Sequence, residues 1–274
     1  MELLNNNAQT LVKFFEFVAF IRKFFSEQNF LDVMALPMVF HPGIEPHIHP
    51  LQIYSAYEKK QLPFYLQTSP EFMLKDLLSQ VNRPLFSLTY SFRDEPCSPH
   101  HRKQFLMLEW YRPSSGLADI MEDCANLIHK ALSHLHQQGL TTTLPSQNIS
   151  IVKKTVQEIF QEQLGFDILS YLDFNSLLTY IKNHLKDIPL PAKPESLLWE
   201  DLFFLIFLNK IEPILKEYPL FILYEYPSPL AALSRIKEND SRVCERFEIY
   251  IHGVEIGNCF YELTDVYEQE TRGK

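Results

Sequence analysis

A β-hairpin predicted within residues 86–111 carries most of the side chains in this chain that could do chemistry together. Successive side chains of a strand point to opposite faces, so residues of one parity share a face. Around the loop of the hairpin, one face carries Arg93, Phe105, Glu109 and Tyr111. An arginine binds phosphate or carboxylate, a ring stacks on a base, and a carboxylate binds an ammonium group. The hairpin therefore predicts a pocket for a nucleotide beside an amino acid.

Two further segments have side chains that suit the same chemistry. Near the C-terminus, within residues 246–265, three side chains have the same strand parity and could line a pocket: Asn258, Phe260 and Glu262. Earlier in the chain, Ser69, Pro70 and Glu71 have the order of a helix start. The serine is the expected N-cap, the proline the first helical residue, and the glutamate a residue of the first turn.

These segments together resemble the class II aminoacyl-tRNA synthetases, and the lysyl branch among them. Residues 92–113 are similar to motif 2 of that family, and residues 246–265 to its E-R-F-E … G-x-E-x-x-N-G-F-x-E-L-T-D segment. Residues 68–71 match its T-S-P-E. The serine at position 69 and the strand end at 108–113 are most similar to a short branch of lysyl-type enzymes. That branch attaches (R)-β-lysine to a lysine of elongation factor P.

The resemblance implies the fold of a class II synthetase catalytic domain. This is an α/β domain of the α+β type, with an antiparallel sheet flanked by helices. It is expected to be a single domain over residues 1–274, with a less typical segment at 140–200 that contains a proline-rich linker at 189–194.

The resemblance also implies an adenylation reaction, in which a carboxylate joins the α-phosphate of ATP. The protein's part in it is to hold two anions in line and to neutralise growing charge. Arg93 would bridge the α-phosphate and the amino-acid carboxylate, and is the implied catalytic residue. Glu95 would bind the adenine amino group, His101 would approach the γ-phosphate, and Phe105 would stack on adenine.

By the same resemblance, carboxylates would recognise both ends of the amino acid. Glu71 and Glu109 would bind its α- or β-amino group, while Glu262 and Tyr111 would bind its ε-ammonium. Buried carboxylates without a cationic partner are costly. Three glutamates that converge on one pocket therefore predict a ligand with two positive charges, such as lysine or (R)-β-lysine.

Four more positions complete the implied ligand set. Asn258 would contact the amino-acid carboxylate, and Phe260 would pack on the aliphatic stem. Glu248 and Glu255 match the pair of glutamates that hold Mg²⁺ between phosphates, since magnesium takes one or two carboxylates plus phosphate oxygens. The other interpretation of Glu248 is a strand residue that forms an ion pair with Arg246.

The elements that must position these residues follow from apolar periodicity. Helices are predicted over 10–29, 114–139 and 202–215, and a buried strand over 220–226. Residues 30–38 resemble motif 1, the helix-then-strand dimer element of the family, with Pro37 as its signature proline and a spacing one residue longer than usual. A homodimer is therefore expected.

Composition favours a protein partner over a nucleic acid. The net charge is −9, from 34 acidic and 25 basic residues. Affinity for nucleic acid depends on neutralising phosphates, so tRNA is disfavoured and a partner with a basic face is favoured. The 4 cysteines have no paired spacing, no signal peptide precedes the first helix, and the longest apolar run is far too short to span a bilayer. These features predict a cytoplasmic protein with no membrane contact.

The resemblance implies three candidate functions. The leading one is an ATP-dependent ligase that activates (R)-β-lysine or lysine as an adenylate and transfers it to a lysine of elongation factor P. The second is a catalytically impaired paralogue with a binding or regulatory role, because no G-x-G-x-x-R motif 3 occurs up to residue 274 and the final strand and helix of the fold are expected to be missing. The third is a lysine-tRNA ligase, disfavoured because no anticodon-binding domain is expected before the first helix.

Overall fold

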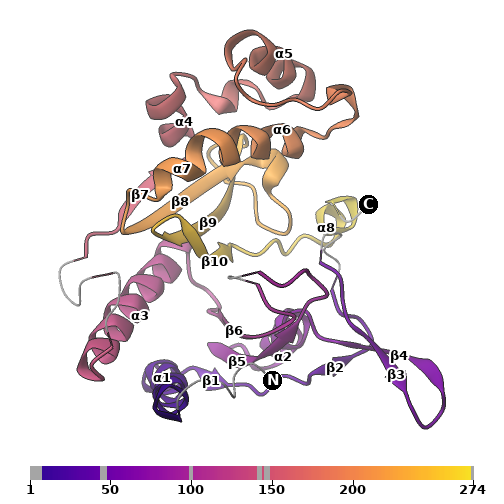
Figure 1. Cartoon of the computed structure of the whole chain (residues 1–274), viewed down its shortest axis with the longest axis vertical. Helices are drawn as coiled ribbons and strands as arrows, with labels where there is room; N and C mark the ends of the chain where they lie inside the picture. Colours follow the sequence, from indigo (N-terminus) through magenta and orange to yellow (C-terminus); the bar gives the residue numbers. More distant parts are fainter. Residues whose placement is uncertain (1–7, 44–47, 99–100, 141–143, 145–148, 273–274) are drawn as a thin grey trace. The chain divides into compact units, whose positions relative to one another are not determined.

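The computed structural model describes residues 8–43, 48–98, 101–140, 144 and 149–272 (Figure 1). The chain divides into two compact units: residues 1–115 with 134–140, and residues 116–133 with 141–274. Both contain antiparallel strands and helices, which confirms the predicted fold class. A single domain over the whole chain stays a prediction. Among the described residues, no helix combines the length and the apolar character needed to cross a membrane.

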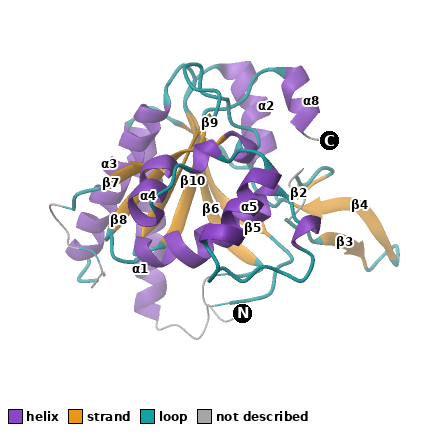
Figure 2. Cartoon of the chain, turned by 90° about the horizontal axis from the view of Figure 1, so that it is seen from above, coloured by secondary structure: helices purple, strands orange, loops and turns teal. Residues whose placement is uncertain are grey.

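The first unit contains two three-stranded sheets. One has the order β1-β5-β6, from β1 (Leu31–Asp32), β5 (Leu85–Phe92) and β6 (Gln104–Tyr111). The other has the order β2-β4-β3, from β2 (Met38–Val39), β3 (Gln52–Ser55) and β4 (Lys60–Leu66), whose strands lie side by side in Figure 2. Its helices are α1 (Ala8–Glu27) and α2 (Glu71–Val81).

Helix α1 confirms the helix predicted over residues 10–29, with both ends shifted by two residues. The ring of Phe25 on this helix stacks on the ring of Phe86 in β5, with 4.8 Å between the ring centres. Its centre lies 5.3 Å from that of the Trp110 ring in β6. The region resembling motif 1 does contain a helix followed by a strand, but the strand β1 has two residues and Pro37 lies beyond it.

The start of α2 differs from the sequence prediction by one residue. The helix begins at Glu71, and Pro70 occupies the N-cap position with φ −79° and ψ 1°. The hydroxyl of Ser69 accepts a hydrogen bond from the Glu71 N–H at 3.3 Å. The assigned helix thus begins one residue later than predicted, whereas the Ser69 hydroxyl makes the bond to the second N–H after it that an N-cap side chain makes.

The second unit is built on a sheet of four strands in the order β10-β9-β8-β7. They are β7 (Val152–Thr155), β8 (Leu220–Pro227), β9 (Val243–Ile251) and β10 (Val254–Phe260), antiparallel except for the parallel pair of β7 and β8. The helices are α3 (Leu117–Gln137, of which residues 117–133 belong to this unit), α4 (Val156–Leu164), α5 (Phe174–His184), α6 (Trp199–Ile206), α7 (Glu212–Leu215) and α8 (Val266–Arg272).

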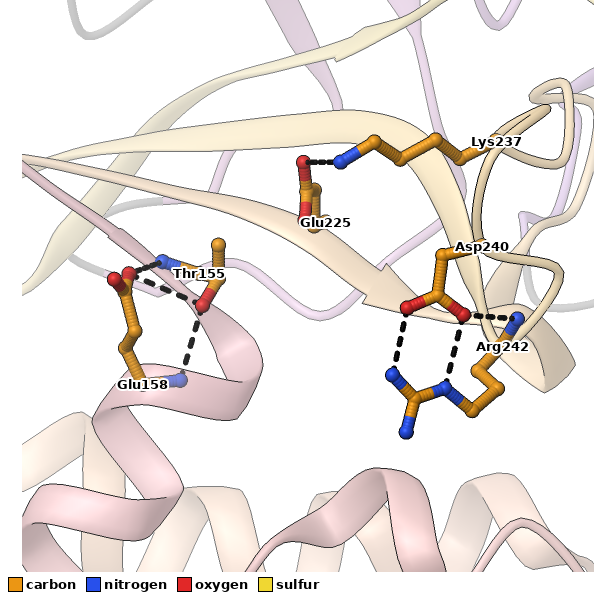
Figure 3. Close-up of polar contacts among 6 residues, drawn as sticks. All are labelled: Thr155, Glu158, Glu225, Lys237, Asp240 and Arg242. Atoms are coloured by element: carbon orange, nitrogen blue, oxygen red, sulfur yellow. Dashed lines mark hydrogen bonds and ion pairs between the residues drawn. The ribbon is translucent and has the colours of Figure 1, made fainter.

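The described part of the less typical segment from residue 149 to residue 200 contributes to this unit's core. Helices α4, α5 and α6 pack with β8 around one apolar cluster that includes Phe160, Leu177 and Phe203. Helix α4 starts with a capping box, which Figure 3 shows. The Thr155 hydroxyl accepts from the Glu158 N–H at 3.0 Å, and the Glu158 carboxylate accepts from the Thr155 N–H at 2.7 Å.

The helix predicted over residues 202–215 is present but interrupted. A π-helical turn, Phe207–Ile211, separates α6 from α7, and the Glu212 N–H bonds the Phe207 carbonyl. Pro213 has no N–H and its ring would clash with the carbonyl four residues before it. The wider turn accommodates that proline without ending the helical path. The buried strand predicted over 220–226 is confirmed as β8.

Candidate active site

The hairpin of β5 and β6 places its polar side chains as the alternation predicted. Ser91 lies opposite Phe105, and Ser87 lies opposite Glu109, so the face with Phe105 and Glu109 is shared across both strands. The guanidinium of Arg93 lies 5.4 Å from the centre of the Phe105 ring. Its Nε donates to the Thr68 carbonyl at 3.4 Å, which ties the end of β5 to the segment that precedes α2.

Two carboxylates of this unit lie close to one lysine. Lys75, one turn after Glu71 on α2, has its Nζ 2.6 Å from Glu71 Oε1. The Tyr111 hydroxyl donates to Glu109 Oε2 at 3.4 Å. Burial, and then the charge of Glu71, raises the pKa of Glu109 to about 8, against the opposing effects of Lys75, Tyr111 and Arg93. The approach of a cation would therefore favour loss of the Glu109 proton to solvent.

The loop between the strands carries the other two residues that the motif assigns to ATP. Glu95 is half-buried, two residues after Arg93. His101 is exposed, with its Nδ1 2.9 Å from the Ser98 hydroxyl. Lys103 forms an ion pair with Asp94 across the base of the loop.

In the second unit, the register of β9 and β10 places charged, polar and aromatic side chains on one face of the sheet. Arg246 pairs with Phe260, Glu248 with Asn258, and Tyr250 with Glu255. A β-bulge between Glu255 and Gly257 lets Glu255 share the face of Asn258, although the two differ in parity. The turn between the strands consists of His252 and Gly253, both with positive φ.

A second bulge brings Tyr226 to the same face. The register of β8 against β9 shifts between Tyr224 and Tyr226, where Glu225 has φ 55°. There the single residue Glu225 faces two residues of β9, Glu245 and Arg246, and Tyr226 pairs with Cys244 on the face of Glu248. Register shifts against both neighbours of β9 therefore bring side chains to the face of Glu248.

Glu248 is a buried carboxylate with three hydrogen-bond donors. Arg246 Nη2 lies 2.5 Å from its Oε1, and the hydroxyls of Tyr226 and Tyr250 both donate to its Oε2. Arg246 and Glu248 are 10% and 9% exposed. Burial and the charge of Glu248 raise the pKa of both tyrosines, which keeps them as donors. The ion pair of Glu248 with Arg246, which the sequence offered as the other interpretation, is thus observed.

The guanidinium of Arg246 lies close to two aromatic rings and one carbonyl group. It lies 4.4 Å from the centre of the Tyr226 ring and 5.2 Å from that of Phe260. Its Nη1 donates to the Leu230 carbonyl at 3.0 Å. Such an arginine has little freedom to leave Glu248.

The carboxylate oxygen atoms of Glu248 and Glu255 could supply part of the coordination shell of a magnesium ion. Partial burial of its carboxyl group and the charge of Glu248 raise the pKa of Glu255, an effect that a cation would reverse. Three of the roughly four acceptor positions of Glu248 are occupied, so it can offer at most one to a metal. The donor set therefore suits an ion that takes one or two carboxylates and completes its shell with phosphate and water.

The shared parity predicted for the C-terminal segment is confirmed for Asn258 and Phe260. Asn258 is exposed and Phe260 is half-buried. Glu262 lies beyond the end of β10, half-buried, in an isolated bridge with Ser234.

Sequence reasoning missed Lys75, Tyr226 and Tyr250. The spacing of Glu71 and Lys75, four residues apart on a predicted helix, could have revealed the first. The tyrosines depend on strand register and on a bulge, for which we see no signal in the sequence.

Comparison with known proteins agrees with these motifs. The family model of class II tRNA synthetases (D, K and N) matches residues 1–274. The chain belongs to this family. Within it, the chain is similar to proteins named elongation factor P–(R)-β-lysine ligase from Salmonella paratyphi B and Salmonella heidelberg. The identity is 33% over 265 residues, which cover 96% of this chain and 76% of each relative. The class II resemblance found in the sequence is thereby confirmed.

Proposed function

We propose that this chain is an ATP-dependent ligase that activates (R)-β-lysine or lysine as an adenylate and transfers it to a lysine of elongation factor P. The observation that carries the proposal is the similarity, over 96% of the chain, to proteins named for that reaction. The carboxylates of Glu71 and Glu109 support it, because they suit an ammonium ligand.

Activation would depend on the motif 2 residues of the first unit. Arg93 bridges the α-phosphate of ATP and the carboxylate of the amino acid, and neutralises the charge that grows as they join. Phe105 stacks on adenine, Glu95 binds its amino group, and His101 approaches the γ-phosphate. The position of Arg93 beside Phe105 supports these roles.

The amino acid would be recognised by its charges. Glu71 and Glu109 bind the α- or β-amino group, and Glu262 with Tyr111 binds the ε-ammonium. Asn258 contacts the carboxylate, and Phe260 packs on the stem.

Magnesium would be held by Glu255 together with the remaining acceptor position of Glu248. The ion supplies charge neutralisation for the phosphates of ATP. Of these two glutamates, Glu255 would be the one whose carboxylate moves toward the ion, since Glu248 is held by Arg246.

The proposed acceptor is a protein, and the proposed assembly is a homodimer. Exposed apolar side chains lie around the segment resembling motif 1, at Met34, Leu36 and Met38, and suit a second copy of the chain. The four cysteines are free thiols, which suits a reducing compartment and hence a cytoplasmic location.

The test is mass spectrometry of elongation factor P after incubation with the protein, ATP, Mg²⁺ and (R)-β-lysine. We expect an adduct of lysyl mass on one lysine, absent without ATP. Charging of tRNA without such an adduct would identify a lysine-tRNA ligase instead. Binding of the amino acid with neither product would identify the impaired paralogue.

A further inference from the structure

Lys75 already places an ammonium group against one carboxylate of the first unit. Its Nζ lies 2.6 Å from Glu71 Oε1, and both side chains are only 28% exposed. A glutamate four residues before a lysine is the favourable order on a helix. Helix α2 is held in place by Leu74, which is fully buried against Leu85 and Val33. The pair is therefore partly dehydrated and is carried by a helix that core packing holds in place.

The neighbouring charges set the balance of this cluster. From α2 come Glu71 and Lys75, from β6 Glu109 and the Tyr111 hydroxyl, and from the end of β5 Arg93. Glu71 is neutralised by Lys75. Since the pKa of Glu109 is about 8, that group is mostly protonated at pH 7. Without ligand, the cluster thus contains the Glu71 carboxylate, whose charge Lys75 balances, and the neutral carboxyl group of Glu109.

We propose that Lys75 is a specificity-determining residue: its ammonium occupies Glu71, so that the amino group of an incoming amino acid must pair with Glu109. This inference rests on the proposed function, because it deepens the assignment of Glu71 and Glu109 to the amino group. One end of the site is thereby restricted to a single ammonium group. Each binding event also removes one proton from the Glu109 carboxyl group and releases it to solvent.

The proposal gives binding a pH dependence of definite sign. Below about pH 8 the ligand binds only the deprotonated form of Glu109, so affinity should rise with pH. The limit is about tenfold per pH unit, levelling near pH 8. Without Lys75, the ligand's ammonium would pair with the charged Glu71, and Glu109 would keep its proton. The slope should then largely disappear.

The experiment is calorimetric titration of the full chain with (R)-β-lysine or lysine at pH 7, in two buffers of different ionisation enthalpy. The protein is expected to release close to one proton per ligand. The variant Lys75→Met should release almost none and bind at least as tightly. Lys75→Arg keeps the charge and should release as many protons as the original protein. Lys23→Met removes the lysine of an exposed i,i+4 pair with Glu27 on α1 and serves as the matched control.

Equal proton release and equal affinity in the original protein and Lys75→Met would overturn the proposal. If neither protein binds lysine or (R)-β-lysine, the proposed function fails. Ethylammonium then decides the role of Lys75, with the Glu109 carboxyl followed by ¹³C NMR. The probe should lower the pKa of Glu109 in the original protein and leave it unchanged in Lys75→Met. The same shift in both would count against Lys75.

Discussion

The two units of this chain each contain a pair of glutamates, and the pairs differ in what neutralises them. In the first unit, Glu71 is bound by Lys75, and the Tyr111 hydroxyl donates to Glu109 at 3.4 Å. In the second unit, Glu248 is bound by a buried arginine and two tyrosines. With Glu71 occupied by Lys75, an incoming ammonium can pair with Glu109, whereas it cannot replace a buried guanidinium that lies close to two aromatic rings.

The difference indicates separate tasks for the two pairs. A carboxyl group with a raised pKa and a neutral hydroxyl donor suits recognition of a cation. A buried carboxylate held by three donors suits a fixed position beside a charged reactant, since its geometry does not change when a ligand arrives. The predictions below test this contrast between the two pairs.

The largest effect is expected from Arg246→Met. This change leaves the Glu248 carboxylate buried without its cation, and breaking such a pair costs about 3–5 kcal/mol of unfolding free energy. Urea denaturation measures the loss. The control is Arg242→Met, which removes the exposed pair with Asp240 drawn in Figure 3 and should lose far less. Equal losses would show that Arg246 is not a special partner.

A smaller loss is expected from Tyr226→Phe. The change removes one hydrogen bond to a buried charged group, worth about 1.5–3 kcal/mol. The matched variant is Tyr224→Phe, on the other side of the register shift in β8. The Tyr224 hydroxyl donates to no group in the Glu248 network. Denaturation that shows the same small loss for both tyrosines would contradict the assigned network.

The stability of the protein should depend on pH through Glu109. Its pKa is raised in the folded state to about 8, so the folded protein binds more protons than the unfolded chain between about pH 4.5 and pH 8. Stability therefore falls as pH rises through that window. Glu109→Gln removes this effect, and between pH 5 and pH 7 its stability should fall less than that of the original protein, by about 2 kcal/mol. Parallel pH profiles of the two proteins would refute the raised pKa.

The smallest effect on stability is expected from Lys75→Met. A partly exposed i,i+4 ion pair contributes about 0.3–0.5 kcal/mol, so the midpoint of urea denaturation should barely move. This result would complete the contrast with Arg246→Met. A loss as large as that of the buried arginine would mean that Lys75 is a structural partner of Glu71.

The hairpin of β5 and β6 was predictable because its signal is local. The alternation of apolar and polar residues assigned Phe105 and Glu109 to one face, and the register with Ser91 and Ser87 confirms that assignment. The capping box at the start of α4 was equally readable, although residues 140–200 were interpreted only as mixed. Local side-chain rules suffice for such elements.

Apart from the pair of Glu248 and Arg246, the Glu248 network was beyond sequence reasoning because bulges change the relation between parity and face. Glu255 and Asn258 differ in parity yet share a face, and Tyr226 joins them only through the register shift at Glu225. Strand pairing between distant segments decides such contacts. The helix α2 was predicted to begin at Pro70 and begins at Glu71, a difference of one residue. Proline is typical of the first helical position, but here it occupies the N-cap.

The proposed adenylation is tested most directly by exchange of labelled pyrophosphate into ATP in the presence of single amino acids. We expect (R)-β-lysine or lysine to support exchange, and arginine and leucine to support little, because the glutamates of the site select for an amino group at each end of an unbranched stem. Arg93→Met should lower the exchange rate by about 10²–10³-fold, since it removes one charge stabiliser from the reacting centre. Exchange that shows no preference for lysine or (R)-β-lysine over arginine and leucine would contradict the proposed site.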